Sequence, residues 1–363
     1  MHVLAVAALA AFLVSLGVTP LARGLAHRLH LFDRPNERSS HLRPTPRLGG
    51  VAMLAGALAG MVAGGALGDR GAAVLLGAAL PVAALGLIDD VRGFRAWPKL
   101  AVHLLAGAAA VVAGGMALER LEIPLVGAVP LGPAAILVSL VWLVWLLNAY
   151  NFMDGVNGIA ATQAVVAGAC MSALLAGRGD VHGAVLAAGV AAAAAGFLPW
   201  NFPRASIFMG DVGSTSLGFM FALLSLRVAH TGAPFVAAVL PLFPFLFDAT
   251  LTVLLRMVRG ERFVSTPHRL HLYQRLLSLG WSHTRVTLLW GVLALAGAAA
   301  GLAYAGAGDP VRALLLAAVL AIHAALAVWV MARTPLPPPD PAVLRPRVRA
   351  RRGLDPYSGP EGA

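Results

Sequence analysis

The sequence predicts an all-α polytopic membrane protein with about eleven transmembrane helices, ten at the least. Of its 363 residues 59% are apolar and only 12% are charged, about half the charged share of soluble domains. The charges are clustered, and they separate apolar stretches of about 20 residues, the length that spans a bilayer. A single cysteine, Cys170, excludes an intrachain disulfide.

The apolar stretches set the order of the expected helices along the chain. Gly56, Gly60 and Gly64 recur every four residues in the second stretch, a pattern that favours close helix packing in lipid. Residues 119–132 alternate in polarity, which predicts a short hairpin. The expected spans are 2–22, 49–68, 72–88, 99–118, 133–150, 157–177, 182–199, 213–230, 233–255, 284–305 and 312–332.

These spans form one integral-membrane domain, predicted over 1–332. The remainder, 333–363, is rich in Pro and Arg and is expected to be a disordered cytoplasmic tail that either stays solvated or touches anionic lipid. If the N-terminus lies outside, 22 of the 27 Lys and Arg residues fall in inside segments and five outside. The positive-inside rule therefore predicts a periplasmic N-terminus and a cytoplasmic C-terminus. The net charge of +11 reflects this topology, and no nucleic-acid partner is expected.

Polar clusters occur at the inside ends of the spans, whereas the middles of the spans are nearly free of charge. Transporters keep ionisable residues near the bilayer midplane, so this distribution favours an enzyme with a cytosol-facing cleft. Asp248 is the clear exception. Two roles are open for Asp248: it forms an ion pair with Arg256, or it supports the cleft without contacting substrate.

Three carboxylates at inside span ends suit metal and acid–base chemistry. Asp89 and Asp90 are adjacent at a membrane edge, so a divalent cation or a proton is needed to offset their repulsion. The alternative is a solvated helix end that faces Arg92 and Arg95. Asp211 is flanked by glycines and suits Mg²⁺, which takes one or two carboxylates plus waters and substrate phosphate.

The segment 148–158 carries Asn148, Asn151, Asp154 and Asn157 at every third position. A regular helix cannot keep such a row on one face, so the helix is expected to end here and to present the four side chains together. A nucleobase or a sugar would satisfy them. Helix capping around a tight loop is the alternative.

Two further segments border these carboxylates. Phe208 is placed to stack on a flat ring, and Ser214 is expected to cap the following span. Gly49 and Gly50 allow a close backbone approach. The preceding segment, 33–47, is either an anion-binding loop or only a basic one.

The last long inside loop, 256–285, combines histidines with arginines. His268 and His271 are three residues apart and are expected to share a helix face. No cysteine is near, so phosphate binding by bidentate guanidinium groups is favoured over zinc. The arginines of this loop include Arg256, Arg259, Arg262, Arg269 and Arg275.

These groups together fit phosphoryl transfer between a soluble nucleotide and a lipid phosphate. At this point the chain resembles the polyprenyl-phosphate N-acetylhexosamine-1-phosphate transferases, glycosyltransferase family 4, over about residues 33–283. Five motifs occur in the family's order. They are Asp33-x-Pro to Pro46-Arg47-x-Gly49-Gly50, Asp89-Asp90 with Lys99, Asn151-Phe-Met-Asp154-Gly-x-Asn157-Gly158, Phe208-Met-Gly-Asp211-x-Gly-Ser214, and the loop that contains His268.

The resemblance implies transfer of a sugar-1-phosphate from a UDP-N-acetylhexosamine to undecaprenyl phosphate, with release of UMP, at the bacterial inner membrane. It implies Mg²⁺, with Mn²⁺ as the alternative ion, held by Asp211 and Asn151. A covalent aspartyl-phosphate route and direct deprotonation of the lipid phosphate both stay open. The implied catalytic residues are Asp89, Asp90, Asp211 and His268, and the implied substrate-binding residues are His41, Arg47, Asn151, Asp154, Asn157, Phe208, Arg269 and His271.

Two departures from the common motifs of the family indicate which of its branches the chain resembles. His268-Arg269-Leu270-His271 stands where the phospho-MurNAc-pentapeptide branch has three consecutive histidines, and Arg38-Ser39-Ser40-His41 replaces the common Arg-Lys-x-His. Both are more similar to the branch that initiates lipopolysaccharide O-antigen or other cell-envelope glycans. This implies UDP-GlcNAc or a 6-deoxy relative such as FucNAc or QuiNAc as the sugar. Phospho-MurNAc-pentapeptide transfer and a lipid-linked sugar flippase are the alternatives; membrane lipids are expected partners, and a homodimer is left open.

Overall fold

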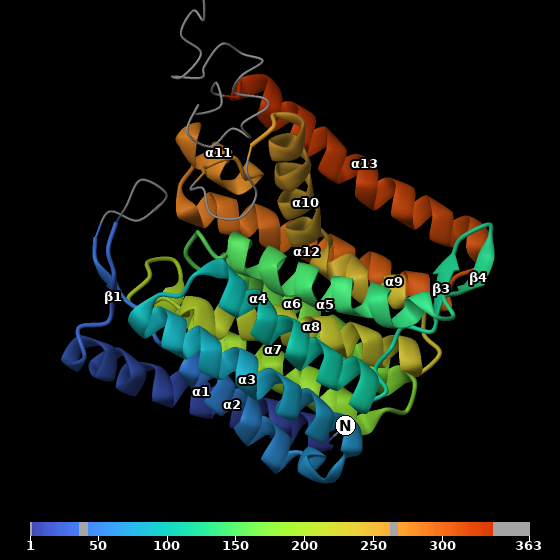
Figure 1. Cartoon of the computed structure of the whole chain (residues 1–363), viewed down its shortest axis with the longest axis horizontal. Helices are drawn as coiled ribbons and strands as arrows, with labels where there is room; N and C mark the ends of the chain where they lie inside the picture. Colours follow the sequence, from blue (N-terminus) through green and yellow to red (C-terminus); the bar gives the residue numbers. More distant parts are fainter. Residues whose placement is uncertain (1, 36–42, 262–267, 337–363) are drawn as a thin grey trace, which may run out of the picture.

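The computed structural model describes residues 2–35, 43–261 and 268–336. Within them ten helices are long and apolar enough to cross a membrane, and the shorter apolar helix α2 lies beside them. The expected all-α polytopic fold is confirmed (Figure 1). The helices are α1 (His2–Arg28), α2 (Gly49–Ala63), η1 (Ala66–Gly68), α3 (Arg70–Arg92), α4 (Ala96–Ala108), η2 (Ala109–Ala113), α5 (Ala134–Met153), α6 (Ile159–Gly177), α7 (Val181–Asn201), α8 (Gly210–His230), α9 (Phe235–Val239), η3 (Leu240–Leu242), α10 (Phe243–Val258), α11 (Leu272–Ser278), α12 (His283–Gly306) and α13 (Asp309–Arg333).

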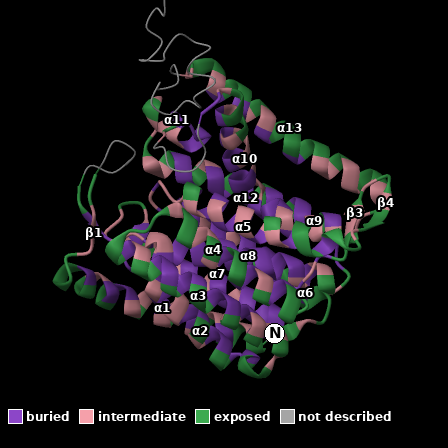
Figure 2. Ribbon diagram, viewed as in Figure 1, coloured by how far each residue is buried: buried purple, intermediate pink, exposed green. Residues whose placement is uncertain are grey.

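Helix α8 forms the centre of the bundle. In the most apolar 18-residue stretch of α8, 94% is buried inside the protein. The corresponding share is 22% for α1 and for α13, which lie at the periphery. Figure 2 shows the buried residues gathered around α7 and α8, with exposed residues along the outer helices. A central helix is shielded from lipid on all sides, so it can carry polar groups at its end where protein partners satisfy them.

The small-residue face expected in α2 is present and packs against α1 and α7. A Cβ at Gly56 would lie 2.6 Å from the Ala11 carbonyl oxygen, and one at Gly60 would lie 2.8 Å from the Ala7 carbonyl oxygen. A Cβ at Gly64 would lie 2.5 Å from Val185. Glycine at these positions lets the backbones approach closely, which stabilises helix pairs in lipid.

The expected spans correspond to helices of the structure, with three differences in detail. The stretch 49–68 is divided into α2, which is shorter than the ten spans, and η1. The stretch 233–255 is divided into α9, η3 and α10 where Pro241 and Pro244 begin new helical segments. The stretch 99–118 ends in the π-helical turn η2 (Ala109–Ala113). The last two breaks arise from local backbone geometry that a hydropathy pattern does not reveal.

The structure contains two short antiparallel strand pairs among its described residues. The hairpin expected within 119–132 is confirmed as β3 (Arg120–Ile123) and β4 (Gly127–Pro130), with Arg120 opposite Pro130. A second pair joins β1 (Phe32–Asp33) to β2 (Thr45–Pro46). In Figure 1 the two pairs lie at opposite sides of the bundle.

Helix α13 ends at Arg333, close to the predicted domain boundary. Residues 334–336 follow it, and the predicted tail lies outside the described residues from 337 onward.

Arg227 ties together three helix ends at the end of α8 far from Gly210. Its Nε and Nη1 lie 2.6 Å from Asp180 Oδ2 and 2.8 Å from Asp69 Oδ2. Each carboxylate also caps a helix: Asp69 accepts from Ala72 N at the start of α3, and Asp180 accepts from Gly183 N at the start of α7. This cluster sets the relative positions of α3, α7 and α8.

Candidate active site

The end of α3, the start of α4 and the start of α8 bring two carboxylates to one ammonium group. Lys99 Nζ lies 2.7 Å from Asp89 Oδ2 and 3.2 Å from Asp211 Oδ2. Asn151, at the end of α5, donates from Nδ2 to Asp211 Oδ1 at 3.1 Å. Four residues from the ends of four helices therefore form one cluster, and of these Asp89 and Lys99 alone are close in sequence.

Asp90 has a different environment from its neighbour Asp89. Its side chain is 1% exposed, and its two oxygens accept from the backbone N–H groups of Asp211 at 3.0 Å and Val212 at 3.1 Å. These N–H groups belong to the first turn of α8, which has no intrahelical acceptors for them. Arg47 Nη1 approaches Asp90 Oδ1 at 3.8 Å. Asp90 therefore holds the helix start that carries Asp211.

The Gly49–Gly50 pair makes the close approach that the sequence predicts. A Cβ at Gly50 would lie 2.3 Å from Gly213 N. The backbone N–H of Gly49 donates to the Phe208 carbonyl at 2.9 Å, and Arg47 forms an isolated bridge with Phe208. Two predicted substrate-binding residues, Arg47 and Phe208, are thereby brought side by side.

The polar side chains of the segment 148–158 have different partners in the structure. Helix α5 does end within it, at Met153 as expected. Asn151 faces Asp211, whereas Asn148 donates to the Val144 carbonyl of its own helix at 2.7 Å. Asn157 donates to the Pro203 carbonyl at 3.2 Å. Of these three asparagines Asn151 therefore contacts the carboxylate cluster, whereas Asn148 and Asn157 bond to backbone carbonyls.

Ser214 is not a helix cap, contrary to the expectation. Helix α8 begins at Gly210, so Ser214 lies in its second turn and donates to the Gly210 carbonyl at 3.1 Å. Its hydroxyl also accepts from Asn151 Nδ2 at 2.8 Å. Ser214 therefore orients Asn151 against Asp211.

Asn201 is a further structural residue of the site, and the sequence, where it begins the polar segment before Asp211, predicted no role for it. It is buried at the end of α7, where it accepts from Gly158 N at 2.7 Å and donates to the Ile207 carbonyl at 2.9 Å. It joins the turn after α5 to the segment before Asp211. An asparagine at the end of an apolar span is the only signal that could have drawn attention to it.

Asp154 lies in the turn after α5, near the other carboxylates. Burial raises its pKa well above the usual range, and the charges of Asp211, Asp90 and Asp33 raise it further. Acidic side chains are thus concentrated at this end of the bundle, which favours binding of a cation there.

The histidines of the last loop are close together, but they do not share a helix face. Helix α11 begins only at Leu272, with His271 as its N-cap and His268 ahead of it. The two rings are nevertheless 5.2 Å apart. The His271 side chain is buried, since the residue is only 4% exposed. The helical expectation is wrong because the chain enters α11 in an extended conformation.

Several arginines of this loop have structural partners. Arg256 and Arg259 contact Glu261 at 3.0 and 2.6 Å. Arg275 donates to the hydroxyl of Thr334 at 2.8 Å and to its carbonyl. Arg269 is exposed, while Arg262 and the predicted substrate residue His41 lie outside the described residues.

Asp248 does not pair with Arg256, one of the two alternatives left open by the sequence. It is fully buried in α10 and accepts from His271 Nδ1 at 3.1 Å. The buried carboxylate therefore contacts the loop that carries the two histidines.

The donor atoms fit a magnesium ion held jointly with substrate. Among the described residues no group of three or more His, Cys, Asp or Glu side chains could hold a metal by itself. Mg²⁺ needs only one or two protein carboxylates when waters and substrate phosphates complete the octahedron. Asp211 offers such a carboxylate, and turning the Asn151 amide would direct Oδ1, in place of Nδ2, toward the same position.

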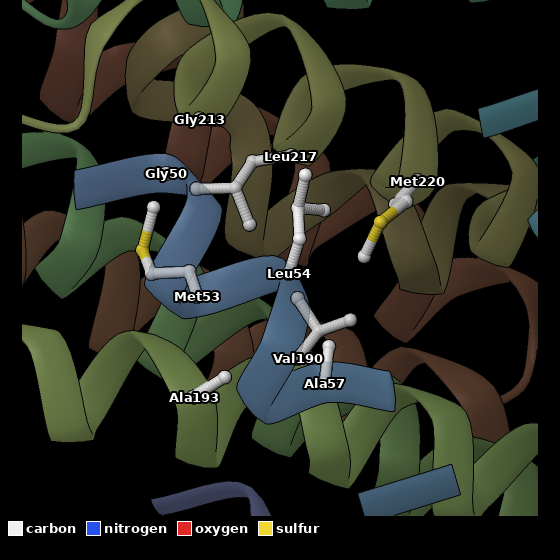
Figure 3. A pocket seen from close by; sticks show the side chains of 9 residues that line it. All are labelled: Gly50, Met53, Leu54, Ala57, Val190, Ala193, Gly213, Leu217 and Met220. Atoms are coloured by element: carbon white, nitrogen blue, oxygen red, sulfur yellow. The ribbon is translucent and has the colours of Figure 1, made fainter. Parts of the chain in front are cut away.

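A small void behind Gly50 does not contribute to the site. It lies between α2, α7 and α8 and is lined by apolar residues, as Figure 3 shows. Its volume of about 10 Å³ is at the lower limit for one water molecule. The lining residues are Gly50, Met53, Leu54, Ala57, Val190, Ala193, Gly213, Leu217 and Met220.

The chain is similar to known proteins over most of its length. The model of the family described as "Glycosyl transferase family 4" matches residues 72–229, which include Asp89, Asp90 and Asp211. A decaprenyl-phosphate N-acetylglucosaminephosphotransferase of Mycobacterium leprae (strain TN) is 34% identical over 319 residues, covering 79% of this chain and 80% of the relative.

Two further relatives represent other named activities. The Bacillus subtilis (strain 168) protein named "Probable undecaprenyl-phosphate N-acetylglucosaminyl 1-phosphate transferase" is 31% identical over 289 residues, which cover 78% of this chain and 80% of the relative. A phospho-N-acetylmuramoyl-pentapeptide-transferase of Desulforudis audaxviator (strain MP104C) is 31% identical over 332 residues, with 82% and 97% coverage.

Proposed function

The chain belongs to glycosyl transferase family 4, and we propose that it transfers an N-acetylhexosamine-1-phosphate from a UDP-sugar to a polyprenyl phosphate, releasing UMP. One observation carries the proposal. Asp89 and Asp211, from two different helices, share the Lys99 ammonium beside Asn151 at one end of the bundle. Such a set of oxygen donors with one cationic group suits the charge of a diphosphate and a lipid phosphate.

The chemistry is a displacement at phosphorus. An oxygen of the lipid phosphate forms a bond to the β-phosphorus of the UDP-sugar, and the bond from that phosphorus to the bridging oxygen breaks, leaving UMP. Both oxygens of Asp90 already accept backbone hydrogen bonds. Both oxygens of Asp89 are also hydrogen-bonded, Oδ1 to Phe94 N and Oδ2 to Lys99 at 2.7 Å, but its side chain is 11% exposed, against 1% for Asp90. We therefore assign removal of the lipid phosphate proton to Asp89, the more accessible carboxylate of the pair.

Asp211 and Asn151 would hold Mg²⁺, or Mn²⁺ as the alternative ion. When bound, the ion neutralises the phosphates and the charge that develops on the leaving oxygen. Ser214 and Asp90 keep Asn151 and Asp211 in position through the hydrogen bonds of the α8 start.

For the substrates we propose undecaprenyl phosphate and UDP-GlcNAc or a 6-deoxy relative such as FucNAc or QuiNAc. The printed names of two relatives contain N-acetylglucosamine and a polyprenyl phosphate, which supports this choice. The product would initiate a surface glycan such as O-antigen. The cleft would open to the cytoplasm at the bacterial inner membrane, in line with 22 basic residues in the predicted inside segments and five outside.

A donor panel tests the proposed function. Membranes that contain the full chain are incubated with undecaprenyl phosphate, Mg²⁺ and one of UDP-GlcNAc, a UDP-6-deoxy-HexNAc or UDP-MurNAc-pentapeptide, and both UMP and lipid-linked product are measured. We expect UMP release only when donor, lipid and Mg²⁺ are all present. Turnover of UDP-MurNAc-pentapeptide alone would contradict the surface-glycan assignment, and no turnover of any donor would contradict the proposed reaction.

Asp211→Asn is expected to lower UMP release by about 100-fold or more, because a metal contact contributes several kcal/mol to transition-state stabilisation. Asp309→Asn is the matched control, since Asp309 is half-exposed at the start of α13 beside Arg312. We expect the control to keep wild-type turnover. Full activity of Asp211→Asn would refute the role of Asp211.

A further inference from the structure

Asp248 is a buried carboxylate that the proposed chemistry does not use. It lies in α10 (Phe243–Val258) and is fully buried, although α10 belongs to a membrane-spanning segment. A buried ionisable group in a span requires several hydrogen bonds to offset its lost hydration. We therefore expect Asp248 to be held by several hydrogen-bond donors in this part of the fold.

Four donors meet the two oxygens of Asp248. Oδ1 accepts from the Thr252 hydroxyl at 3.2 Å, His271 Nδ1 at 3.1 Å and Leu272 N at 2.9 Å. Oδ2 accepts from Tyr273 N at 3.2 Å. Three of these donors come from one segment, His271–Tyr273, so Asp248 attaches the start of α11 to α10.

The same segment is fixed on its other side by the turn after α5. The Tyr273 hydroxyl donates to the Phe152 carbonyl at 3.1 Å. A Cβ at Gly155 would overlap this hydroxyl, so a glycine is needed there for the contact. Phe152 directly follows Asn151, which donates to Asp211. A chain of contacts thus runs from Asp248 through Tyr273 to the carboxylate cluster.

The hydrogen bond to Asp248 also fixes the ring of His271. A carboxylate accepts, so His271 Nδ1 carries the proton in this bond. The His271 ring stacks on Tyr273 at 5.5 Å and lies 5.2 Å from the His268 ring. His271 is 4% exposed and its ring lies beside that of the partly exposed His268, so a shift of His271 would displace its neighbour.

We propose that Asp248 is the positioning residue for the His268–His271 segment, acting through His271 Nδ1 and the two backbone N–H groups to place His268 and Arg269 against the cleft. This inference rests on the proposed function. It requires a carboxylate specifically, because a carboxylate has two oxygens that accept and no donor. An amide would keep one accepting oxygen and would direct an N–H group at the donors of the loop.

Asp248→Asn tests the proposal with little change in volume. We expect kcat for UMP release to fall about 100-fold, since displacement of a reacting group by about 1 Å has an effect of that size. KM for the UDP-sugar should stay within threefold of wild type, because the direct contacts of Asp211 with Lys99 and Asn151 do not involve the His268–His271 segment. Thr252→Val is the matched control: it removes only the hydroxyl donor to Asp248, and kcat should stay within threefold.

Two substitutions of His271 separate positioning from direct contact with substrate. In Asn the amide nitrogen falls near the place of Nδ1 and can still donate to Asp248, whereas in Gln it falls near the place of Nε2 and cannot. We expect His271→Asn to keep at least tenfold more activity than His271→Gln. The reverse order would overturn the proposal, because it would show that His271 acts through Nε2.

Hydrogen exchange of the full chain in detergent tests the attachment without reference to activity. The amides of Leu272 and Tyr273 should lose protection in Asp248→Asn and keep it in Thr252→Val. Unchanged protection would overturn the proposal even if kcat falls. If the wild type turns over no UDP-sugar but these amides respond as expected, the proposed function fails while the positioning of the loop by Asp248 stands.

Discussion

Asp89 and Asp90 show how adjacent residues of one helix acquire different tasks. Successive side chains on a helix point about 100° apart, so the two carboxylates face different neighbours. Asp90 faces the first N–H groups of α8, whereas Asp89 faces Lys99 and the cluster. Sequence alone predicted that the pair was functional, and the orientation of α8 decided that Asp90 is the carboxylate that accepts its first N–H groups.

Lys99 is a second residue whose importance emerges only from the assembled site. It appeared in the sequence as part of a motif, without a role of its own. In the structure its ammonium is the group that lies between Asp89 and Asp211. Two carboxylates at this spacing repel each other unless a cation lies between them.

Lys99→Met is therefore expected to lower kcat for UMP release by about 10- to 100-fold, since hydrogen bonds to charged groups contribute about 1.5–3 kcal/mol. Lys99→Arg should recover part of this loss because it keeps the charge. Arg92→Met provides the control, as Arg92 is an exposed basic residue at the end of α3. Equal activities of Lys99→Met and Arg92→Met would refute the bridging role.

At the scale of the elements, the contact between α3 and α8 decides whether the site forms. A Cβ at Gly86 would lie 2.7 Å from both Cα and N of Val212, directly beside Asp211. Asp89 and Asp90 follow Gly86 within one turn. Any side chain at position 86 would therefore move these carboxylates away from Asp211.

Gly86→Ala should reduce turnover by about 100-fold, the effect expected of a displacement of about 1 Å at the reacting groups. Gly77→Ala in the same helix is the matched control, because a Cβ there has no neighbour within 4 Å. UMP release and thermal unfolding in detergent are measured for both variants. Similar turnover of the two would show that the distance between α3 and α8 does not limit catalysis.

Most helices and strands were predictable from the sequence, but the conformation of the segment 268–278, which includes α11, was not. Hydropathy predicts spans because a bilayer requires continuous apolar helices. The spacing of His268 and His271 favoured a helix, but three donors at the start of α11 meet Asp248 instead. A buried carboxylate 23 residues away thus decided the local conformation.

At the scale of the whole molecule, α8 is held at both of its ends. Asp90 accepts from its first N–H groups, and Arg227 near its last turn bonds to the caps of α3 and α7. The sixteen residues from Asp211 to Arg227 span roughly 24 Å of helix. The Arg227 cluster therefore fixes, from the far side of the bundle, the helix that carries Asp211.

This cluster makes stability depend on pH. Burial alone would raise the pKa of Asp69 and Asp180, but hydrogen bonds from Arg227 and from backbone N–H groups outweigh burial and lower both values. Carboxyls with a lowered folded pKa stabilise the fold above their unfolded pKa of about 3.9. That contribution is lost as the pH falls through the folded values.

The midpoint of thermal unfolding in detergent should therefore decrease as the pH is lowered below about 4. Arg227→Lys should lower the midpoint at neutral pH, because one ammonium cannot reproduce the bidentate contact with Asp180 and the contact with Asp69. Its acid-induced decrease should also be smaller, because without the Arg227 contacts the folded pKa values of Asp69 and Asp180 lie closer to the unfolded ones. Arg178→Lys, at an exposed arginine that donates only to carbonyls, is the control. Coinciding curves for all three proteins would contradict the role of Arg227.

The sequence by itself determined the membrane fold, the order of the spans, the hairpin at 120–130 and the motifs that carry the carboxylates. These features follow from composition, periodicity and local turn chemistry, which act between residues close in the chain. Only the tertiary structure decided that Asp90 holds α8, that Lys99 bridges two carboxylates and that Asp248 attaches the histidine loop. Each of these contacts joins residues more than twenty positions apart, except that of Lys99 with Asp89. Their geometry depends on how close glycines allow the helices to approach, and hydropathy carries no information about that distance.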